Sequence, residues 1–205
     1  MMDDSSTSLA GKTALVTGAA RRLGRVIALA LAQQGANVVV HYNRSAEDAA
    51  SLCEEIRGLG VSAWSVPGDL SDAGQTESLF DRATQDAGPI DILINSASTF
   101  EKETLWEASA QSLEANLRLH ATAPLILARA LARQNRGGSI VNMLDTRVTV
   151  YDRQHAAYHI SKRVLLTLTR MLALELAPGI AVNAVAPGLI LPPAGEDEKI
   201  GRAHV

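Results

Sequence analysis

The stretch Thr17-Gly18-Ala19-Ala20-Arg21-Arg22-Leu23-Gly24 decides the fold that we expect for this 205-residue chain. The apolar run 13–16 precedes it, and the helix-forming run 26–32 follows it. A buried strand therefore leads through a tight turn into the N-terminus of a helix. Free backbone N–H groups and the positive end of the helix dipole bind an anionic phosphate at such a place, and small residues let the backbone approach it.

The spacing of this turn differs from the dinucleotide fingerprint G-x-G-x-x-G, because Ala19 follows Gly18 and Arg22 stands near the middle. The rest of the chain alternates strands with helices. Strands are expected at 13–17, 37–42, 61–66, 90–94, 139–144 and 180–185. Helices are expected at 22–35, 46–59, 71–87 with Ser71 as N-cap, 110–134 with a kink at Pro124, and 155–176. This alternation predicts an α/β protein with a Rossmann-type doubly wound parallel sheet in a single domain.

The composition excludes several classes of function. A formal net charge of −3 gives no basic field, so we expect no nucleic-acid partner. The chain has no apolar run of the ~18 residues that span a membrane, and residues 1–8 do not resemble a signal peptide, so we expect a cytoplasmic protein. Cys53 is the single cysteine, and His41, His155, His159 and His204 lack partners at ligand spacing, so no metal is expected.

Polar residues follow the expected strands at the sheet edge where ligands bind. Asn43-Arg44-Ser45 stands where a cofactor with a free ribose 2′-OH would need an acidic residue. A guanidinium and a hydroxyl suit a 2′-phosphate, which favours NADP(H) over NAD(H); the alternative is a solvated Arg44 and a capping Ser45. Asp69 could accept a hydrogen bond from an adenine amino group or be a turn residue. Phe100 could stack on a flat ligand or simply pack in its loop.

A second constellation follows the fifth strand. Asp145 directly follows that strand, and Tyr158 and Lys162 share one face of the next helix at spacing i, i+4. Tyrosine, with a pKa of about 10, is a poor acid–base group at neutral pH, and an adjacent ammonium lowers that pKa. A lone Y-x-x-x-K is a weak motif. Behind a strand-end Asp145, in a sheet opened by a glycine-rich turn, it predicts a proton-transfer site.

These residues resemble the short-chain dehydrogenase/reductase family from about residue 12 to residue 188. The matching motifs are Thr17-Gly18…Gly24, Asp69, Asn95-Ser96-Ala97, Asn116, Tyr158/Lys162 and Pro187-Gly188. Within the family the chain is most similar to the pteridine reductases. That likeness rests on the turn T-G-A-A-[KR]-R-L-G, on His41-Tyr42-Asn43-Arg44-Ser45, on Phe100, and on Asn142-Met143-Leu144-Asp145, where the general family has Ser in place of Asp145.

The resemblance implies NADPH-dependent reduction of a dihydropterin-like substrate, with Asp145, Tyr158, Lys162 and Asn116 as catalytic residues. Tyr158 would donate a proton, Asp145 would help to protonate a ring nitrogen, and Asn116 would order a relay water. Lys162 would bind the nicotinamide ribose and lower the Tyr158 pKa. Substrate contacts would come from Arg22, Ser98, Phe100, Asp145 and Tyr158. Cofactor contacts would come from Gly18, Arg21, Arg22, Leu23, Gly24, His41, Asn43, Arg44, Ser45, Asp69, Leu70, Asn95, Ser96, Ala97, Ser98, Met143, Tyr158, Lys162, Pro187 and Gly188.

The chain departs from the family pattern at Ser96, which replaces the second Asn of N-N-A, and at its end. We expect a disordered lead over 1–9, an NADP-binding domain over 10–191 that lacks the family's substrate-covering helix and last strand, and a tail over 192–205. Residues 200–205 back-translate to a common sequencing adapter, so we hypothesise that they are not natural; the alternative is a true short variant.

The family also implies a homo-oligomer, tetrameric for a full-length protein, because its two long helices pair between subunits. Two rival functions remain open. One is a carbonyl or 3-oxoacyl reductase of the same family, and the other is an inactive nucleotide-binding fragment.

Overall fold

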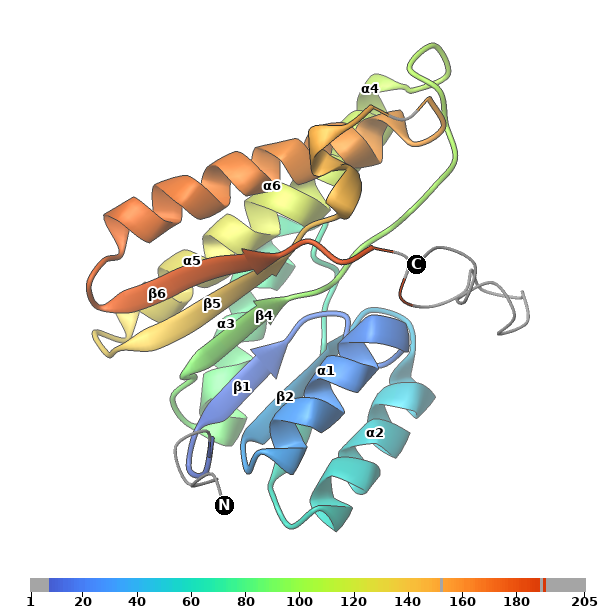
Figure 1. The fold of residues 1–205 in the computed structure, drawn as a ribbon. Coiled ribbons are helices and arrows are strands. Elements are labelled where there is room, and N and C mark those ends of the chain that lie inside the picture. The colour runs from blue at the N-terminus through green and yellow to red at the C-terminus, as the bar shows by residue number, and fades with distance from the viewer. Residues whose placement is uncertain (1–7, 152, 189, 191–205) are drawn as a thin grey trace, which may run out of the picture.

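The structure of the protein, a computed structural model, describes residues 8–151, 153–188 and 190. Most of the expected disordered lead, all of the tail 192–205 and its last six residues lie outside the described residues. Figure 1 shows the described part as a twisted sheet between helices.

Six parallel strands form one sheet in the order β3-β2-β1-β4-β5-β6. The strands are β1 (Thr13–Val16), β2 (Asn37–Tyr42), β3 (Ala63–Pro67), β4 (Ile92–Asn95), β5 (Gly138–Met143) and β6 (Ile180–Val185). This order confirms the predicted doubly wound parallel sheet. The strand order reverses between β1 and β4, and ligands in such sheets bind beyond the carboxyl ends of the strands at this switch point.

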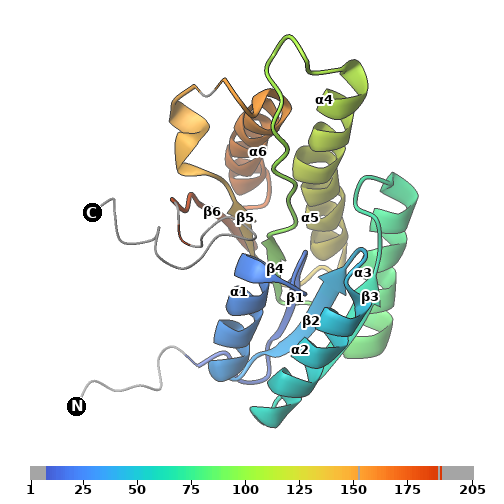
Figure 2. The same cartoon turned by 90° about the vertical axis from the view of Figure 1, so that its right-hand side faces the viewer.

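Helices cover both faces of the sheet (Figures 1 and 2). Helices α1 and α2 lie on one face, and α3, α5 and α6 lie on the other. Their bounds are α1 (Arg22–Gln33), α2 (Ala46–Gly58), α3 (Ala73–Ala87), α4 (Ala110–Leu117), α5 (Ala123–Arg133) and α6 (Ala156–Glu175). A π-helical turn, η2 (Arg118–Thr122), joins α4 to α5, and a short 3₁₀ turn, η3 (Thr146–Thr149), follows β5.

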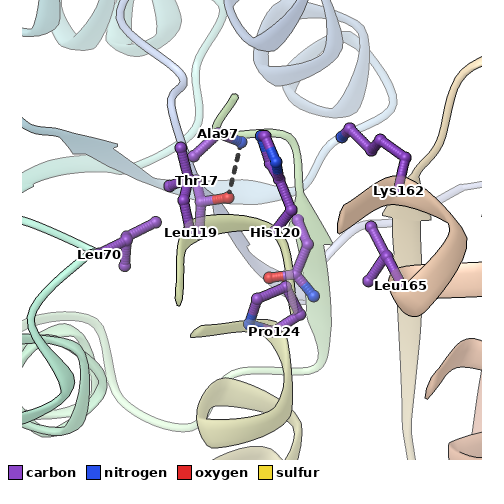
Figure 3. Close-up of a pocket in the computed structure, with 9 residues that line it drawn as sticks. Thr17, Leu70, Ala97, Leu119, His120, Pro124, Lys162 and Leu165 are labelled. Atoms are coloured by element: carbon purple, nitrogen blue, oxygen red, sulfur yellow. Dashed lines mark hydrogen bonds between the residues drawn. The ribbon is translucent and has the colours of Figure 1, made fainter. Parts of the chain in front are cut away.

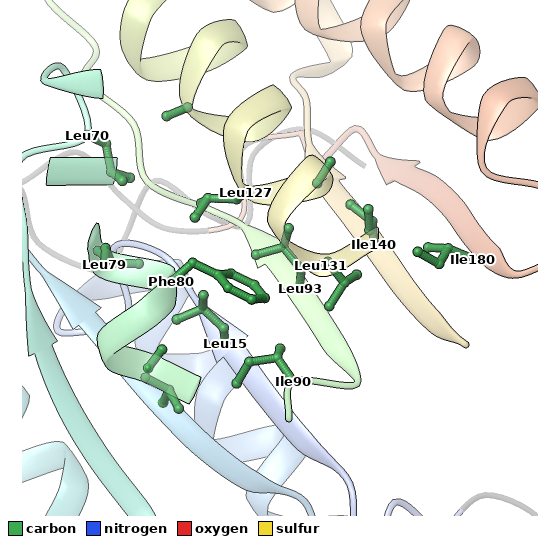
Figure 4. Close-up of a cluster of buried hydrophobic side chains, with 14 of the residues drawn as sticks. Leu15, Leu70, Leu79, Phe80, Ile90, Leu93, Leu127, Leu131, Ile140 and Ile180 are labelled. Atoms are coloured by element: carbon green, nitrogen blue, oxygen red, sulfur yellow. The ribbon is translucent and has the colours of Figure 1, made fainter. Parts of the chain in front are cut away.

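The hydrophobic core is aliphatic and divided by the sheet. Alternate residues of each strand point to opposite faces. Leu15 of β1 therefore packs with α3 and α5 in one cluster, and Val16 packs with α1 and α2 in the other. Figure 4 shows the first cluster, where Leu15, Leu93 and Phe80 meet under α5. The two clusters fix the strand ends that carry the candidate site.

Two helix boundaries differ from the sequence expectation. The N-cap of α3 is Asp72, whose carboxylate accepts from the Gln75 N–H, and not Ser71. The helix expected over 110–134 is interrupted by the π turn η2, immediately before Pro124. Proline has no N–H to donate to the carbonyl of His120 four residues earlier. The irregular turn therefore begins N-terminal to the predicted kink.

Two connecting loops meet above the carboxyl ends of β4 and β5. Glu103, in the loop after β4, forms an isolated parallel bridge with His155, just before α6. Glu103 N–H donates to the Gln154 carbonyl at 2.8 Å, and Ala156 N–H donates to the Glu103 carbonyl at 3.1 Å. The bridge holds the loop that carries Phe100 against the start of α6.

Candidate active site

The helix that follows the β1 turn begins without a side-chain cap. Helix α1 begins at Arg22, and its N-cap residue Arg21 makes no side-chain cap hydrogen bond. The first turn of α1 holds Leu23 and Gly24 and no acidic residue. Because the first N–H groups of a helix lack intrahelical acceptors, this end suits a phosphate group. The Arg21 guanidinium pairs with Asp48 of α2 at 2.6 Å, so it braces the turn from its outer side.

Glycine is required at both ends of this turn. Gly18 has φ of +63°, and a Cβ there would lie 2.7 Å from Ala97 Cα. A Cβ on Gly24 would lie 2.3 Å from the Gly18 carbonyl oxygen. Both distances are far inside normal van der Waals contact. The turn and the loop after β4 are therefore packed backbone to backbone.

His41 lies beneath this turn rather than on the surface that faces a ligand. Its ring is buried, Nδ1 accepts from the Gly18 N–H at 3.0 Å, and Nε2 lies 3.0 Å from the Gly68 carbonyl oxygen. The neutral tautomer with hydrogen on Nε2 satisfies both contacts. Burial lowers the His41 pKa to about 4. His41, which was expected to contact the cofactor, thus supports the turn from below instead.

The residues after β2 and β3 gather around Asp69. Its carboxylate accepts from the Ser71 N–H at 2.9 Å and the Ser71 hydroxyl at 2.7 Å. These bonds, then the charge of Arg44 and a hydrogen bond from Asn43, lower the Asp69 pKa. Ser45 precedes α2 without making a side-chain cap hydrogen bond. Arg44 and Ser45 therefore follow β2 beside Asp69, and their contact with a 2′-phosphate stays a prediction.

The residues after β4 that were expected to bind the cofactor are held in place by hydrogen bonds to neighbouring strands and turns. Asn95 is buried, and its amide donates to Asn142 at 2.7 Å, so its side chain belongs to the framework. Thr17 Oγ1 accepts from the N–H groups of Ser96 at 2.9 Å and Ala97 at 3.1 Å, which fixes this loop to the turn after β1 (Figure 3). At the far side of the site, Thr146 N–H donates to the Pro187 carbonyl, next to Gly188.

A small pocket opens beside these residues, with a volume of about 230 Å³ including the space that leads to solvent. Figure 3 shows Leu70, His120 and Lys162 lining it from three different elements. Its complete lining is Thr17, Leu70, Asn95, Ala97, Leu119, His120, Pro124, Lys162 and Leu165. The pocket therefore connects the turn after β1 with the helix that carries the expected catalytic pair.

Asp145, Tyr158 and Lys162 come together as the sequence predicts. The Tyr158 hydroxyl donates to Asp145 Oδ2 at 3.0 Å, and Asp145 Oδ1 accepts from the Arg147 N–H at 2.7 Å. Lys162 Nζ donates to the Met143 carbonyl at 2.7 Å and lies 5.6 Å from the Tyr158 ring centroid. A carboxylate, a phenol and an ammonium thus meet at the end of β5.

The electrostatics of this group correct one expectation. Burial and then the Asp145 charge and hydrogen bond raise the Tyr158 pKa, against the lowering effect of the Arg147 charge, so the net shift is opposite to the lowered pKa that the resemblance implied. Burial lowers the Lys162 pKa to about 8, against the opposing effect of Asp145. Lys162 is nearly fully buried, and it directs its ammonium at a backbone carbonyl. Tyr158 is consequently held in its protonated form, as a proton donor requires.

Phe100 is half-exposed and already has an aromatic partner. Its ring stacks on His155, with centroids 3.8 Å apart and planes 12° apart, and meets the Tyr158 ring edge-on at 4.8 Å. Phe100 therefore stands beside the expected proton donor, while the bridge at Glu103 holds its loop. The predicted stacking of Phe100 on a ligand stays a prediction.

Asn116 does not reach the pocket with its side chain. Its amide donates to the Ser112 carbonyl of the same helix at 3.0 Å. His120, which sequence reasoning missed, lies at the pocket instead. The signal for it was a histidine within an apolar helical run, four residues before Pro124. Arg22 also lies at the turn, with φ of +51°, in the left-handed region that non-glycine residues seldom occupy.

Within the described ranges, no group of three or more His, Cys, Asp or Glu side chains could hold a metal ion. The helices of the same ranges are all too short or too polar to cross a membrane.

Comparison with known proteins gives consistent findings. Residues 12–201 match the family model described as short chain dehydrogenase. The chain is 34% identical over 190 residues to the 3-oxoacyl-[acyl-carrier-protein] reductase FabG of Staphylococcus aureus, covering 88% of this chain and 75% of the relative. It is 35% identical over 193 residues to versicolorin reductase stcU of Emericella nidulans, covering 93% and 73%.

Among solved structures, the chain is similar to FolM alternative dihydrofolate reductase 1 from Brucella canis complexed with NADP. The TM-score is 0.87 and the identity 34%, over 95% of this chain and 78% of that one. The protein of the same name from Brucella suis, also in complex with NADP, matches with a TM-score of 0.84 and 35% identity, covering 88% and 76%.

Proposed function

The chain belongs to the short-chain dehydrogenase/reductase family of NAD(P)-dependent oxidoreductases, and from this premise we propose that it reduces a dihydropterin-like substrate with NADPH. The observation that carries the proposal is the hydrogen bond between the Tyr158 hydroxyl and Asp145. A strand-end carboxylate bonded to the tyrosine gives the site a second group able to handle protons. Reduction of a ring C=N bond needs a proton at nitrogen, and Asp145 would support its delivery.

The residues present fit NADPH. The uncapped start of α1 and the Gly18 turn would hold its phosphates, and Arg44 with Ser45 would hold the 2′-phosphate. When bound, NADPH supplies a hydride. The FolM structures from Brucella, which contain NADP, support this choice of cofactor.

The protein's own groups would handle the proton. Tyr158 keeps its hydroxyl proton, because its pKa is raised, and would release it to a basic atom of the substrate. The Lys162 ammonium, 5.6 Å from the phenol ring, would then offset the negative charge left on Tyr158. Asp145 would orient the Tyr158 hydroxyl, or a water between them, toward the ring nitrogen that takes the single proton accompanying the hydride.

The likeness to FabG favours a second candidate, reduction of a 3-oxoacyl thioester or another carbonyl compound. That chemistry needs Tyr158 and Lys162 but gives Asp145 no necessary role, because a ketone oxygen takes its proton from the tyrosine. An inactive nucleotide-binding fragment is the third possibility, and it predicts cofactor binding without turnover.

The discriminating experiment follows NADPH oxidation with dihydrobiopterin and with an acetoacetyl thioester as substrates. We expect turnover of dihydrobiopterin, a fall of about 10²-fold or more in Asp145→Asn, and loss in Tyr158→Phe. Asp86→Asn, which changes an exposed carboxylate of α3, is the matched control and should retain full activity. Pterin activity in Asp145→Asn within about threefold of the wild-type value would contradict the role of Asp145.

A further inference from the structure

His41 joins the turn after β1 to the loop after β3, at the edge of the sheet where ligands bind. It lies near the carboxyl end of β2, which runs between β1 and β3. Its Nδ1 accepts from the Gly18 N–H at 3.0 Å, and its Nε2 lies 3.0 Å from the Gly68 carbonyl oxygen. The imidazole ring therefore connects two strand ends that are not neighbours in the sheet.

These two contacts allow one state of the ring. A backbone N–H can only donate and a carbonyl oxygen can only accept, so Nδ1 carries the lone pair and Nε2 carries the hydrogen. The buried ring is therefore neutral. The bridge consequently needs an acceptor facing Gly18 and a donor facing Gly68, and one side chain supplies both.

Main-chain hydrogen bonds reinforce the bridge. The Ala19 N–H donates to the His41 carbonyl at 2.9 Å, and the Gly68 N–H donates to the Tyr42 carbonyl at 3.0 Å. Two consecutive N–H groups of the turn, from Gly18 and Ala19, are thus bonded to residue 41. An anion would then be met by the start of α1, where the first N–H groups lack intrahelical acceptors.

Close packing confines the joined segments on their other sides. A Cβ on Gly18 would lie 2.7 Å from Ala97 Cα. A Cβ on Gly68 would lie 2.9 Å from Leu79 Cδ1 and 3.8 Å from His41 Nε2. The turn is therefore held between the imidazole ring and the loop after β4, and Gly68 is held between the ring and α3.

The residue after Gly68 extends this connection to the cationic end of β2. Hydrogen bonds from Ser71 are the main cause of the lowered Asp69 pKa, and the Arg44 charge and a hydrogen bond from Asn43 lower it further, against the effect of burial. Asp69 therefore lies beside the segment that carries Arg44. A continuous path of contacts runs from the turn after β1, through the imidazole ring, to that segment.

We infer that His41 is a positioning residue that fixes the turn after β1 relative to the loop after β3, so that one dinucleotide can contact both. This inference rests on the proposed use of NADPH and deepens it. The start of α1 would hold the pyrophosphate, and Arg44 would hold the 2′-phosphate. His41 would contact neither phosphate group and would instead set the distance between their binding groups.

Two substitutions separate the two halves of the bridge. In His41→Asn the amide oxygen can replace Nδ1 and keep the Gly18 contact, while the contact with Gly68 is lost. In His41→Gln the amide N–H can replace Nε2 and reach Gly68, while the Gly18 N–H loses its acceptor. Fluorescence titration should give a Kd for NADPH about tenfold higher in each variant, the scale of one hydrogen bond.

A fragment of the cofactor separates positioning from a general loss of structure. Adenosine 2′-monophosphate, measured by competition with NADPH, has no pyrophosphate to reach the turn, so its Kd should change less than about twofold in either variant. Gln134→Met is the matched structural control. The Gln134 amide bonds the Ile90 N–H and carbonyl, both at 2.9 Å, before the start of β4 at the opposite edge of the sheet. This control should lose stability in urea and keep the wild-type Kd for NADPH.

Three results would overturn the inference. The first is a Kd for NADPH within about threefold of the wild-type value in both variants. The second is an equal loss of affinity for adenosine 2′-monophosphate, because the ring would then only support the fold. The third comes from wild-type protein and decides the matter if a variant does not fold: we expect a scalar coupling across the hydrogen bond from the Gly18 N–H to Nδ1, and a ring protonated on Nδ1 would overturn the bridge.

The two proposals can fail separately. Wild-type protein that binds NADPH but does not reduce dihydrobiopterin would overturn the pterin proposal alone, because the affinities of the His41 variants still decide the role of the bridge. Wild-type protein that does not bind NADPH would overturn both proposals together.

Discussion

Acid should destabilise this protein through His41, the buried ring that joins the turn after β1 to the end of β3. Nδ1 accepts the Gly18 N–H, so a proton at Nδ1 would replace that hydrogen bond with two opposed N–H groups. Burial is the largest cause of the lowered His41 pKa. The hydrogen bond to the Gly68 carbonyl and the Asp69 charge raise the pKa, and the Arg82 charge lowers it.

The size of the effect follows from the pKa in the two states. The His41 pKa is 6.5 in an unfolded chain and about 4 in the fold, so the native state binds the proton more weakly. The contribution of neutral His41 to the free energy of unfolding is fully present above pH 6.5. It falls as the pH is lowered toward 4, because the unfolded chain takes up the proton first. At about 1.4 kcal/mol per pKa unit, the loss is about 3 kcal/mol and levels off below pH 4.

Urea unfolding of wild type and His41→Asn, compared at steps from about pH 7 to about pH 4, measures this loss. The asparagine amide oxygen can accept the Gly18 N–H but does not titrate. Other titrating groups, including His120, cancel between the two proteins. We expect the stability of wild type relative to the variant to fall by about 3 kcal/mol over the range. Parallel stability profiles would refute the assignment of the buried neutral ring.

Three further predictions use other parts of the structure. Lys162→Met should abolish turnover yet raise the free energy of unfolding by about 2 kcal/mol, measured with urea at pH 7. The substitution removes a buried charge that destabilises the fold by about 3 kcal/mol and a hydrogen bond that stabilises it by about 1 kcal/mol, so a less stable variant would contradict this. Gly18→Ala should cost about 1–3 kcal/mol and weaken NADPH binding at least tenfold by fluorescence titration, because its Cβ meets Ala97; wild-type affinity would contradict the turn geometry. The exposed stripe on α6 that includes Met171 and Leu174 should support self-association, so Leu174→Glu should lower the mass measured by light scattering; a wild-type protein that is already monomeric would exclude that stripe as an interface.

Much of the fold is predictable because local and global preferences agree. Apolar strands that alternate with helices admit few arrangements other than a parallel sheet covered on both faces. The expected strands and helices lie close to their observed positions. The cap of α3 was misassigned because Ser71 and Asp72 are both good N-cap residues, and Ser71 instead bonds Asp69. That choice depends on the tertiary contact and not on the helix itself.

Part of the site was predictable for a similar reason. Asp145 lies just after a strand, and Tyr158 and Lys162 share a helix face, so their meeting follows from local geometry. His120 could not be found this way, since its position depends on an irregular turn that brings its ring within 3.0 Å of the Ser98 hydroxyl. The family resemblance, and not the residue spacing, suggested Asn116, whose side-chain amide bonds the Ser112 carbonyl within its own helix. The rise of the Tyr158 pKa likewise depends on burial, which residue types alone do not reveal.

The π turn has a consequence for the length of the chain. A π turn bonds residue i to i+5, so the segment from α4 to α5 contains one residue more than a continuous α-helix would use. Deleting that residue would rotate everything on one side of it by about 100° relative to the other. The helix could close into a regular one and still pack, while His120 would leave the pocket. Placement of this histidine therefore depends on the one extra residue in the π turn.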